Sequence, residues 1–323
     1  MPVTGLVLAC AAGRLDRVRA DAVAGQLRVG GARAEVEVRP LAGSEALGAW
    51  ERAEALRVEL RACRAHAAVQ VVSDLPGGDA DGVAIAAVLR RGDARDALLS
   101  RAGTVLAYLP EGARVDALEQ RQVAQILRRR RDLAAAVTVE DVVLAVERFD
   151  QGLGDGLIVR AADLDWLGWS ERAAERFDID QMIPAPGQAA LALEARAGDG
   201  PTLAVLAELD DPWTAYAVAA ERRCAARLGG RRESSVGVHA FTDGETMFIH
   251  GFVSNDDGSR AARLRWSGPS RSPEEVGDTL AELLESVGAR DILSGADLPP
   301  SIRYAERRRQ LIDELEDEED ARD

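Results

Sequence analysis

The stretch AAERRCAARLGGRRESSVGVHA, residues 219–240, places a helix, a turn and a strand in immediate succession. Val218, Cys224 and Leu228 recur at helical spacing among charged residues. The helix should end at Gly229-Gly230, because residues without a Cβ atom adopt the positive φ angles of a turn at little cost. A polar loop, residues 231–235, then leads into a strand that begins at Val236. The sequence therefore predicts a helix, a double-glycine loop and a strand here.

The composition is that of a protein with several ordinary domains. The chain has 323 residues, of which 47% are apolar and 4% aromatic, so its cores should consist mostly of Ala, Val and Leu. That length is enough for roughly two or three domains. The formal net charge of −15 argues against nucleic acid or an anionic membrane as a partner, since both attract a positive face. The histidines, His66, His239 and His250, lack metal-ligand spacing, so no metal is expected.

Cysteine usage and the first residues favour a cytoplasmic protein. The cysteines, Cys10, Cys63 and Cys224, show no CxxC spacing, and their odd number suits a reducing compartment. The stretch MPVTGLVLACAAG has no basic region before its apolar run, so we expect a first strand rather than a secretion signal. No apolar run is long enough to cross a bilayer.

Strands alternate with helices along the first part of the chain, and this pattern predicts parallel α/β layers. Strands are expected at 5–9, 35–39, 67–72, 83–89, 105–108 and 156–161, with helices at 15–27, 47–63, 118–130 and 141–149 and another starting near Asp93 in DARDALLS. Residues 185–196 should turn into a strand that leads back to the first layer.

The last part of the chain predicts a small α+β domain. Strands are expected at 236–241, 247–253 and 261–266, with Asp-Gly turns between them and a covering helix over 273–287. Residues 298–323, which end LIDELEDEEDARD, predict a charged helix that gives way to an acidic tail. That tail could bind a protein partner; the chain itself is expected to be a monomer.

Several stretches in the same order resemble the porphobilinogen deaminase family, also called hydroxymethylbilane synthase. ADLDWLGW at 162–169 is similar to the family's AGLxRLGL, PAPGQAALALEAR at 184–196 to PAVGQGALAIExR, and VVSDLP at 71–76 to HSLKDVP. GDARDALLS at 92–100, GARV at 112–115 and RQVAQILRRRRDL at 121–133 also resemble family stretches. Together with the double-glycine loop, they extend the resemblance from the first strand to Leu293.

The resemblance implies an α/β fold of three domains. Two doubly wound domains, like those of type II periplasmic binding proteins, would face a cleft, and a small α+β C-terminal domain of three strands and a helix would carry the family's cofactor loop. The expected boundaries are 1–91 with 190–207 for the first domain, 92–189 for the second and 208–297 for the third, with the loop at 229–235.

The family joins four porphobilinogens on a dipyrromethane cofactor that a cysteine holds through a thioether. Arg232 stands at the position of that cysteine and cannot form the bond, so the resemblance implies no cofactor here. Cys10 and Cys224 are the other thiols weighed as anchors, but a buried structural cysteine is the stronger interpretation of both.

The family binds the carboxylates of its substrate and product with arginines. Of the paired arginines in one motif, Arg121 remains and the second is Gln122. Three more family arginines fall at Ala11, Val139 and Ala145, and Glu140 and Asp141 add negative charge. We therefore expect a neutral or acidic cleft.

Asp74 matches the family's carboxylate, which steadies the pyrrole nitrogens, and Ser73 replaces the lysine before it. Asp74 is thus the candidate catalytic residue, although Asp is also favoured in a turn before Leu75-Pro76. The candidate ligand-binding residues are Ser73, Arg121, Gln122, Arg231 and Arg232, of which the last two could instead be a solvated loop pair.

Three functions remain open at this point. The leading hypothesis is a divergent family member that has lost the dipyrromethane-primed reaction and binds a small anionic or pyrrolic ligand, or regulates tetrapyrrole metabolism. The alternatives are an active hydroxymethylbilane synthase with an atypical site, which would carry dipyrromethane, and an enzyme recruited to other chemistry with Asp74 as its acid/base group.

Overall fold

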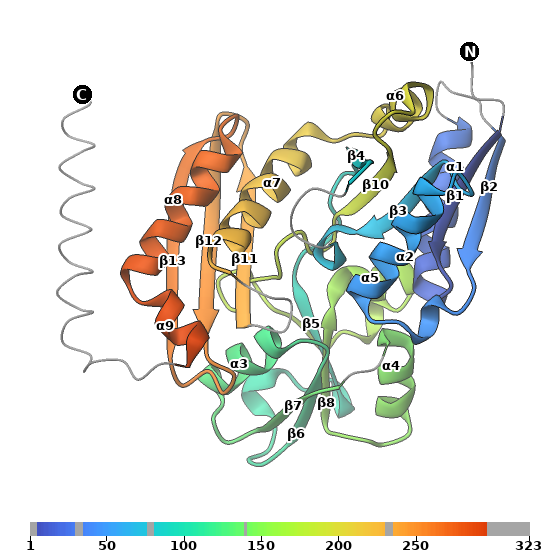
Figure 1. Cartoon of the computed structure of the whole chain (residues 1–323). Helices are drawn as coiled ribbons and strands as arrows, with labels where there is room; N and C mark the ends of the chain where they lie inside the picture. Colours follow the sequence, from blue (N-terminus) through green and yellow to red (C-terminus); the bar gives the residue numbers. More distant parts are fainter. Residues whose placement is uncertain (1–4, 30–34, 76–80, 139–140, 230–234, 296–323) are drawn as a thin grey trace, which may run out of the picture.

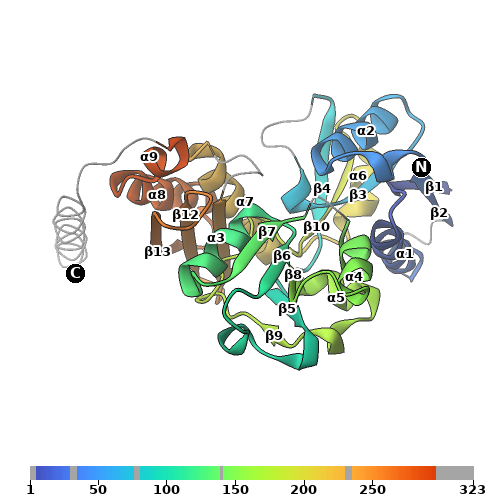
Figure 2. The ribbon, with the colours of Figure 1, turned by 90° about the horizontal axis from the view of Figure 1, so that it is seen from below.

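A computed structural model describes residues 5–29, 35–75, 81–138, 141–229 and 235–295. The strands of these residues form three separate sheets, two of five strands and one of three. Two α/β units adjoin each other, and the antiparallel sheet with its helices lies beside them (Figures 1 and 2). Among the described helices, none has the length and apolar character needed to span a bilayer.

The first sheet has the strand order β2-β1-β3-β10-β4. Its strands are β1 (Gly5–Ala11), β2 (Glu35–Leu41), β3 (Ala67–Val71), β4 (Val83–Val88) and β10 (Leu191–Arg196). β1 is parallel to β2 and β3, and β10 is antiparallel to β3 and β4. Helices α1 (Arg14–Val29) and α6 (Gly200–Ala207) contribute to the core on one face, and α2 (Ala49–Arg61) to the core on the other.

The second sheet repeats this plan in the order β7-β6-β8-β5-β9. Its strands are β5 (Asp96–Ser100), β6 (Arg114–Ala117), β7 (Ala134–Val137), β8 (Gly156–Arg160) and β9 (Glu175–Arg176). Three parallel strands are again followed by an antiparallel one, β5. Helix α3 (Gln120–Arg129) packs on one face, and α4 (Val142–Asp150) and α5 (Ala161–Leu167) pack on the other. Both α/β units are therefore doubly wound, as expected.

The third sheet is an antiparallel meander of β11 (Ser235–Thr242), β12 (Thr246–Ser254) and β13 (Ala261–Pro269). Helices α7 (Pro212–Arg227), α8 (Pro273–Ser286) and α9 (Ala289–Ser294) share one apolar core with it. The backbone N–H of Val238 donates to the carbonyl of Pro184 at 2.9 Å, which joins β11 to the second unit. The α+β domain of three strands and a covering helix is confirmed.

Short 3₁₀ helices complete the described elements: η1 (Ser44–Ala46), η2 (Val72–Asp74), η3 (Arg101–Gly103), η4 (Leu106–Tyr108) and η5 (Ser170–Arg172). The expected domain boundaries stay predictions. β10, which follows all strands of the second sheet in the chain, does belong to the first sheet.

Two expected elements are wrong. The helix expected near Asp93 is strand β5, because residues 96–100 pair with β8, Ala97 and Leu98 also pair with β9, and residues 96–99 are buried. The strand expected at 105–108 is helix η4, where Tyr108 N–H donates to the carbonyl of Val105 at 3.0 Å. In the first case, strands far along the chain decide the conformation, whereas in the second a local turn does.

Candidate functional site

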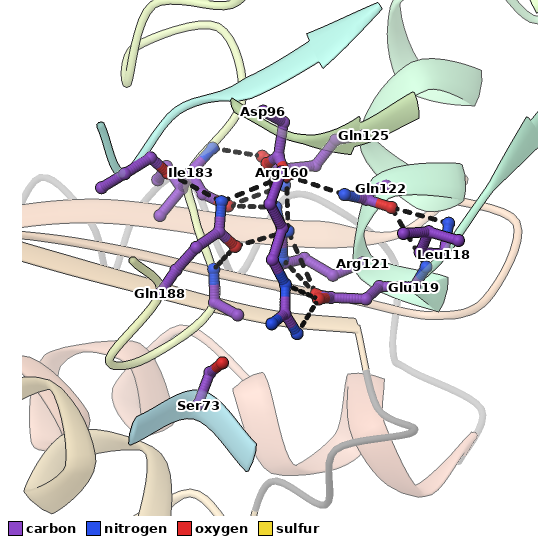
Figure 3. A network of polar contacts seen from close by, with 12 residues as sticks. Ser73, Asp96, Leu118, Glu119, Arg121, Gln122, Gln125, Arg160, Ile183 and Gln188 are labelled. Atoms are coloured by element: carbon purple, nitrogen blue, oxygen red, sulfur yellow. Dashed lines mark hydrogen bonds and ion pairs between the residues drawn. The ribbon is translucent and has the colours of Figure 1, made fainter. Parts of the chain in front are cut away.

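Arg121 lies in the first turn of α3 and is the centre of a buried polar network (Figure 3). Its Nη1 donates to Asp96 Oδ2 and to the carbonyl of Ile183, both at 2.8 Å. Its Nη2 contacts Asp96 and Gln188, and its Nε donates to Glu119 Oε2 at 3.3 Å. The side chain is only 2% exposed. Every guanidinium nitrogen therefore already has a protein acceptor, which an incoming carboxylate would have to displace.

Gln122 stabilises the start of α3. Its Oε1 accepts from the backbone N–H groups of Leu118 and Glu119, at 3.0 Å each, and its Nε2 donates to Asp96 Oδ1 at 2.7 Å. These amides precede the first helical turn, where backbone donors lack helical partners. Gln122 is fully buried, so all of its contacts in the described structure are with the protein.

Arg160, the last residue of β8, connects this network to the first α/β unit. Its Nη2 and Nε donate to Glu119 Oε1 at 2.6 and 2.8 Å. Its Nη1 and Nη2 also lie 3.4 Å from Asp74 Oδ1, on η2 after β3. A guanidinium of the second unit thus faces the candidate catalytic carboxylate of the first.

The charges of this network stabilise one another. Burial alone would lower the pKa of Arg160, but the carboxylates of Glu119 and Asp74 outweigh it and raise that pKa well above its usual value. The pKa of Arg121 is raised in the same way, because Asp96 and Glu119 outweigh burial. Both guanidiniums are therefore held firmly in their charged form.

Asp74 has charged neighbours of both signs. Ser73 Oγ donates to Asp74 Oδ1 at 3.2 Å. The pKa of nearby Asp16 is raised, chiefly by burial, with Asp74 and Asp141 adding to the rise against the opposing effect of Arg19 and Arg52. Asp74 therefore lies among both carboxylates and guanidiniums of the described residues.

A second ion pair crosses between the α/β units beside this network. Arg19 Nη2 on α1 donates to Asp163 Oδ1 on α5 at 2.5 Å, and both side chains are 8% exposed. Burial raises the pKa of Asp163, while Arg19 and Arg160 oppose the rise. Leu15 of α1 packs into the core of the second unit. The two units therefore contact each other through both apolar and charged groups.

Several of the remaining predicted site residues cannot be placed relative to this network. Arg231 and Arg232 lie outside the described residues, as do Val139 and Glu140. Asp141 is the N-cap of α4, where its Oδ1 accepts from the backbone N–H of Val143 at 2.8 Å.

The two candidate thiols are buried. Cys10 at the end of β1 and Cys224 in α7 are both 0% exposed, and burial raises the pKa of each to about 12. Both lie within apolar clusters, which fits the structural interpretation. Among the described residues, no group of three or more His, Cys, Asp or Glu side chains is arranged to hold a metal ion.

Arg160 is the site residue that the sequence reasoning missed. A signal was present: the apolar run GLIVRAADL contains Arg160 in the strand expected at 156–161 and Asp163 directly after it. Charged side chains are almost never fully buried unless they are paired. Two opposite charges three residues apart in such a run indicate partners from elsewhere in the fold.

The fold and site define a class: two doubly wound α/β units that meet at a charged site, with a third antiparallel unit beside them. The family model described as "Porphobilinogen deaminase, dipyromethane cofactor binding domain" matches residues 14–204. The chain belongs to the porphobilinogen deaminase family.

Two relatives illustrate this kinship. The porphobilinogen deaminase of Roseiflexus castenholzii is 36% identical over 236 residues, which cover 73% of this chain and 78% of that protein. The porphobilinogen deaminase of Acidothermus cellulolyticus is 36% identical over 296 residues, 86% of this chain and 88% of that protein. Among solved structures, a TRAP periplasmic solute binding protein from Desulfovibrio salexigens aligns with a TM-score of 0.40 at 13% identity, over 65% of this chain and 73% of that one.

Proposed function

We propose that this protein is a divergent porphobilinogen deaminase homologue of tetrapyrrole biosynthesis that binds a small pyrrolic or anionic ligand near Asp74. It does so without a covalent dipyrromethane and without polymerising porphobilinogen. The observation that carries the proposal is the contact of Arg160 with both Glu119 and Asp74, because it occupies the candidate carboxylate with a cation of the chain itself.

The state of the other charged groups supports weak binding of a polycarboxylate. The nitrogens of Arg121 already donate to Asp96, Glu119 and neighbouring acceptors. For each charge-assisted hydrogen bond that a ligand carboxylate fails to make, the ligand loses about 1.5–3 kcal/mol of binding free energy. A substrate with several carboxylates would forgo several such bonds at once.

The sequence of the double-glycine loop supports the absence of the cofactor. Residues 229–237 read GGRRESSVG and contain no cysteine. A thioether to dipyrromethane requires a thiolate, and the candidate thiols Cys10 and Cys224 are buried with raised pKa values. The family's covalent chemistry therefore has no evident anchor in that loop.

We further propose a cytoplasmic monomer that binds neither nucleic acid nor membrane and whose acidic tail, 298–323, is available to a protein partner. The net charge of −15 supports the exclusion of nucleic acid and of an anionic membrane as partners.

Three measurements on the purified full-length chain test the proposal. Intact-mass analysis should give the unmodified mass, and Ehrlich's reagent should give no colour. Titration with porphobilinogen at low salt, where electrostatic attraction is strongest, should show very weak binding and no bilane. A covalent pyrrolic adduct would overturn the cofactor statement.

A matched pair of variants distinguishes the alternatives. Asp74→Ala removes the candidate carboxylate, and Glu208→Ala removes an exposed carboxylate at the end of α6. Bilane formation that Asp74→Ala abolishes and Glu208→Ala preserves would establish an active hydroxymethylbilane synthase. That second candidate is favoured by the retained Asp74 and by the extent of the similarity to relatives named as porphobilinogen deaminases. Turnover of a different substrate that depends on Asp74 would instead support recruitment to other chemistry.

A further inference from the structure

A pocket of about 430 Å³ lies where the three units meet, and it shares no residue with the network around Arg160. The β4–β5 connection, the start of α7 and the end of β11 supply most of its walls. Its lining residues are Arg91, Gly92, Asp93, Ala94, Arg95, Ile179, Trp213, Thr214, Ala217, His239, Ala240, Phe241 and Thr242. The double-glycine loop connects the opposite ends of α7 and β11, so the pocket lies at the other end of the third unit.

Two partly exposed aromatic side chains give this pocket an apolar wall. Trp213 is 42% exposed and Phe241 is 47% exposed. Phe241 stacks on Phe248, with ring centroids 5.2 Å apart and an interplanar angle of 20°, and Trp213 contacts Tyr216 edge-on. These contacts hold the rings in place, while the exposed parts remain free for a planar ligand. Aromatic rings of this kind bind flat ligands by stacking.

His239 provides a neutral hydrogen-bond donor in the same pocket. Its Nδ1 lies 3.1 Å from Arg91 Nη1. Because a guanidinium can only donate, Nδ1 must accept, and the ring hydrogen is therefore on Nε2. Arg91 is itself fixed by Glu221, at 2.7 and 2.6 Å, so the tautomer is set by a buried ion pair. Burial also keeps the imidazole uncharged at neutral pH.

Arg95 provides the charged donor. Its Nε and Nη2 donate to Asp93, between 2.8 and 3.2 Å, and its side chain is 38% exposed. Its Nη1 has no hydrogen-bond partner among the residues that the structure describes. Both carboxylate oxygens of Asp93 are already engaged by Arg95 and by Arg176. The lining side chains therefore offer donors to a ligand while this acidic group is satisfied.

We propose that this pocket binds a planar aromatic carboxylate, with its ring against Trp213 and Phe241 and its carboxylate accepting from Arg95 and His239. A ligand of this chemistry matches the aromatic wall and both donors. A neutral ring system would contact only the aromatic wall of Trp213 and Phe241. A small inorganic anion would contact only the donors, Arg95 and His239.

The test is calorimetric titration of the full-length chain with 2-naphthoate as the probe and 2-naphthalenemethanol as its neutral counterpart. We expect saturable 1:1 binding of 2-naphthoate with a Kd below about 1 mM, a modest affinity for a ligand of this size. The alcohol should bind at least about tenfold more weakly, a difference of about 1.4 kcal/mol.

Matched variants locate the probe. Trp213→Ala and Arg95→Met should each weaken binding of 2-naphthoate about tenfold or more. Trp50→Ala removes another exposed tryptophan, on α2 and 67% exposed, and should leave the affinity unchanged. Asp74→Ala should also leave it unchanged, which separates this proposal from the proposed function.

Three results would overturn the proposal. They are the absence of saturable binding, equal affinity for the acid and the alcohol, and an equal loss of affinity in Trp50→Ala and Trp213→Ala. Should Arg95→Met fail to fold, Phe241→Ala supplies a second test of the same pocket, with the same expected loss of affinity.

Discussion

Replacing Arg160 by methionine should destabilise the protein strongly, because this side chain joins the two α/β units. The change removes the two donors 2.6 and 2.8 Å from Glu119 Oε1 and the cation 3.4 Å from Asp74. Removing one partner of a buried ion pair costs about 3–5 kcal/mol. Glu119 keeps its contact with Arg121 at 3.1 Å through its other oxygen, so we expect the lower end of that range.

The assay is thermal unfolding followed by circular dichroism. For a chain of this size, with about 2.1 cal/mol/K of unfolding entropy per residue, a loss of about 3 kcal/mol corresponds to a fall of roughly 4–5 °C in Tm. Arg39→Met is the matched control, because it removes an arginine in an exposed ion pair. The side chain of Arg39 is 46% exposed and that of its partner Glu37 is 60% exposed. Exposed pairs contribute about 0–1 kcal/mol, so the control should change Tm by no more than about 2 °C.

A double variant tests the reasoning more directly. Arg160→Met with Glu119→Gln removes both charges of the pair and leaves Arg121 with Asp96, at 2.8 Å. Replacing both partners of a buried pair is often close to neutral, so the double variant should recover much of the stability lost in Arg160→Met. A Tm for Arg160→Met equal to that of Arg39→Met, or a double variant with the two losses summed, would refute the role given to this network.

Three further predictions concern other parts of the fold. Gly258→Ala should destabilise the protein more than Gly295→Ala in denaturant titration. The two glycines have similar φ angles, +66° and +70°, but a Cβ at Gly258 would lie 2.2 Å from the carbonyl oxygen of Ala124, whereas a Cβ at Gly295 would meet open space. Equal losses of stability would show that α3 shifts to accommodate the added methyl group. Ellman's reagent should modify one thiol in the folded chain, Cys63, and all three in denaturant, since Cys10 and Cys224 are buried; a second reactive thiol before unfolding would contradict this burial. Burial lowers the pKa of His239 from 6.5 to about 4, so the unfolded chain binds a proton in this window that the folded chain does not. The free energy of unfolding should therefore fall by up to a few kcal/mol as the pH drops from 6.5 to 4, and His239→Gln should show a shallower slope over that range.

Most of the fold could be predicted because its helices and strands carry their own periodicity. Buried strands such as β1 and β8 are continuous apolar runs, and the Asp-Gly pairs at 243–244 and 257–258 lie at the turns of the meander. Three of the strands that were not predicted are very short: β6 and β7 have four residues each and β9 has two. So few residues cannot establish a period. They are strands because partners more distant in the sequence pair with them.

The candidate site was less accessible to sequence reasoning, because burial and pairing depend on the whole fold. The order of motifs pointed to Arg121 and Gln122, and both lie in one network. Their position in a motif did not reveal that Asp96, Ile183 and Gln188 surround the guanidinium of Arg121. The ligand-binding roles given to Arg121, Gln122 and Ser73 stay predictions.

The charge balance of this network bears most directly on what the site can bind. Asp74, Asp96 and Glu119 supply three carboxylates, whereas Arg121 and Arg160 supply two guanidiniums. Among the described residues these groups pair with one another, because each guanidinium contacts two of the carboxylates. An incoming carboxylate would have to displace one of these contacts in a partly dry region, where opposing charges are poorly screened. A cationic or neutral nitrogen heterocycle would instead find Asp74 able to accept a hydrogen bond once Arg160, 3.4 Å away, moves aside. Under the proposed function, we therefore expect this site to recognise pyrrole N–H groups rather than their carboxylate side chains.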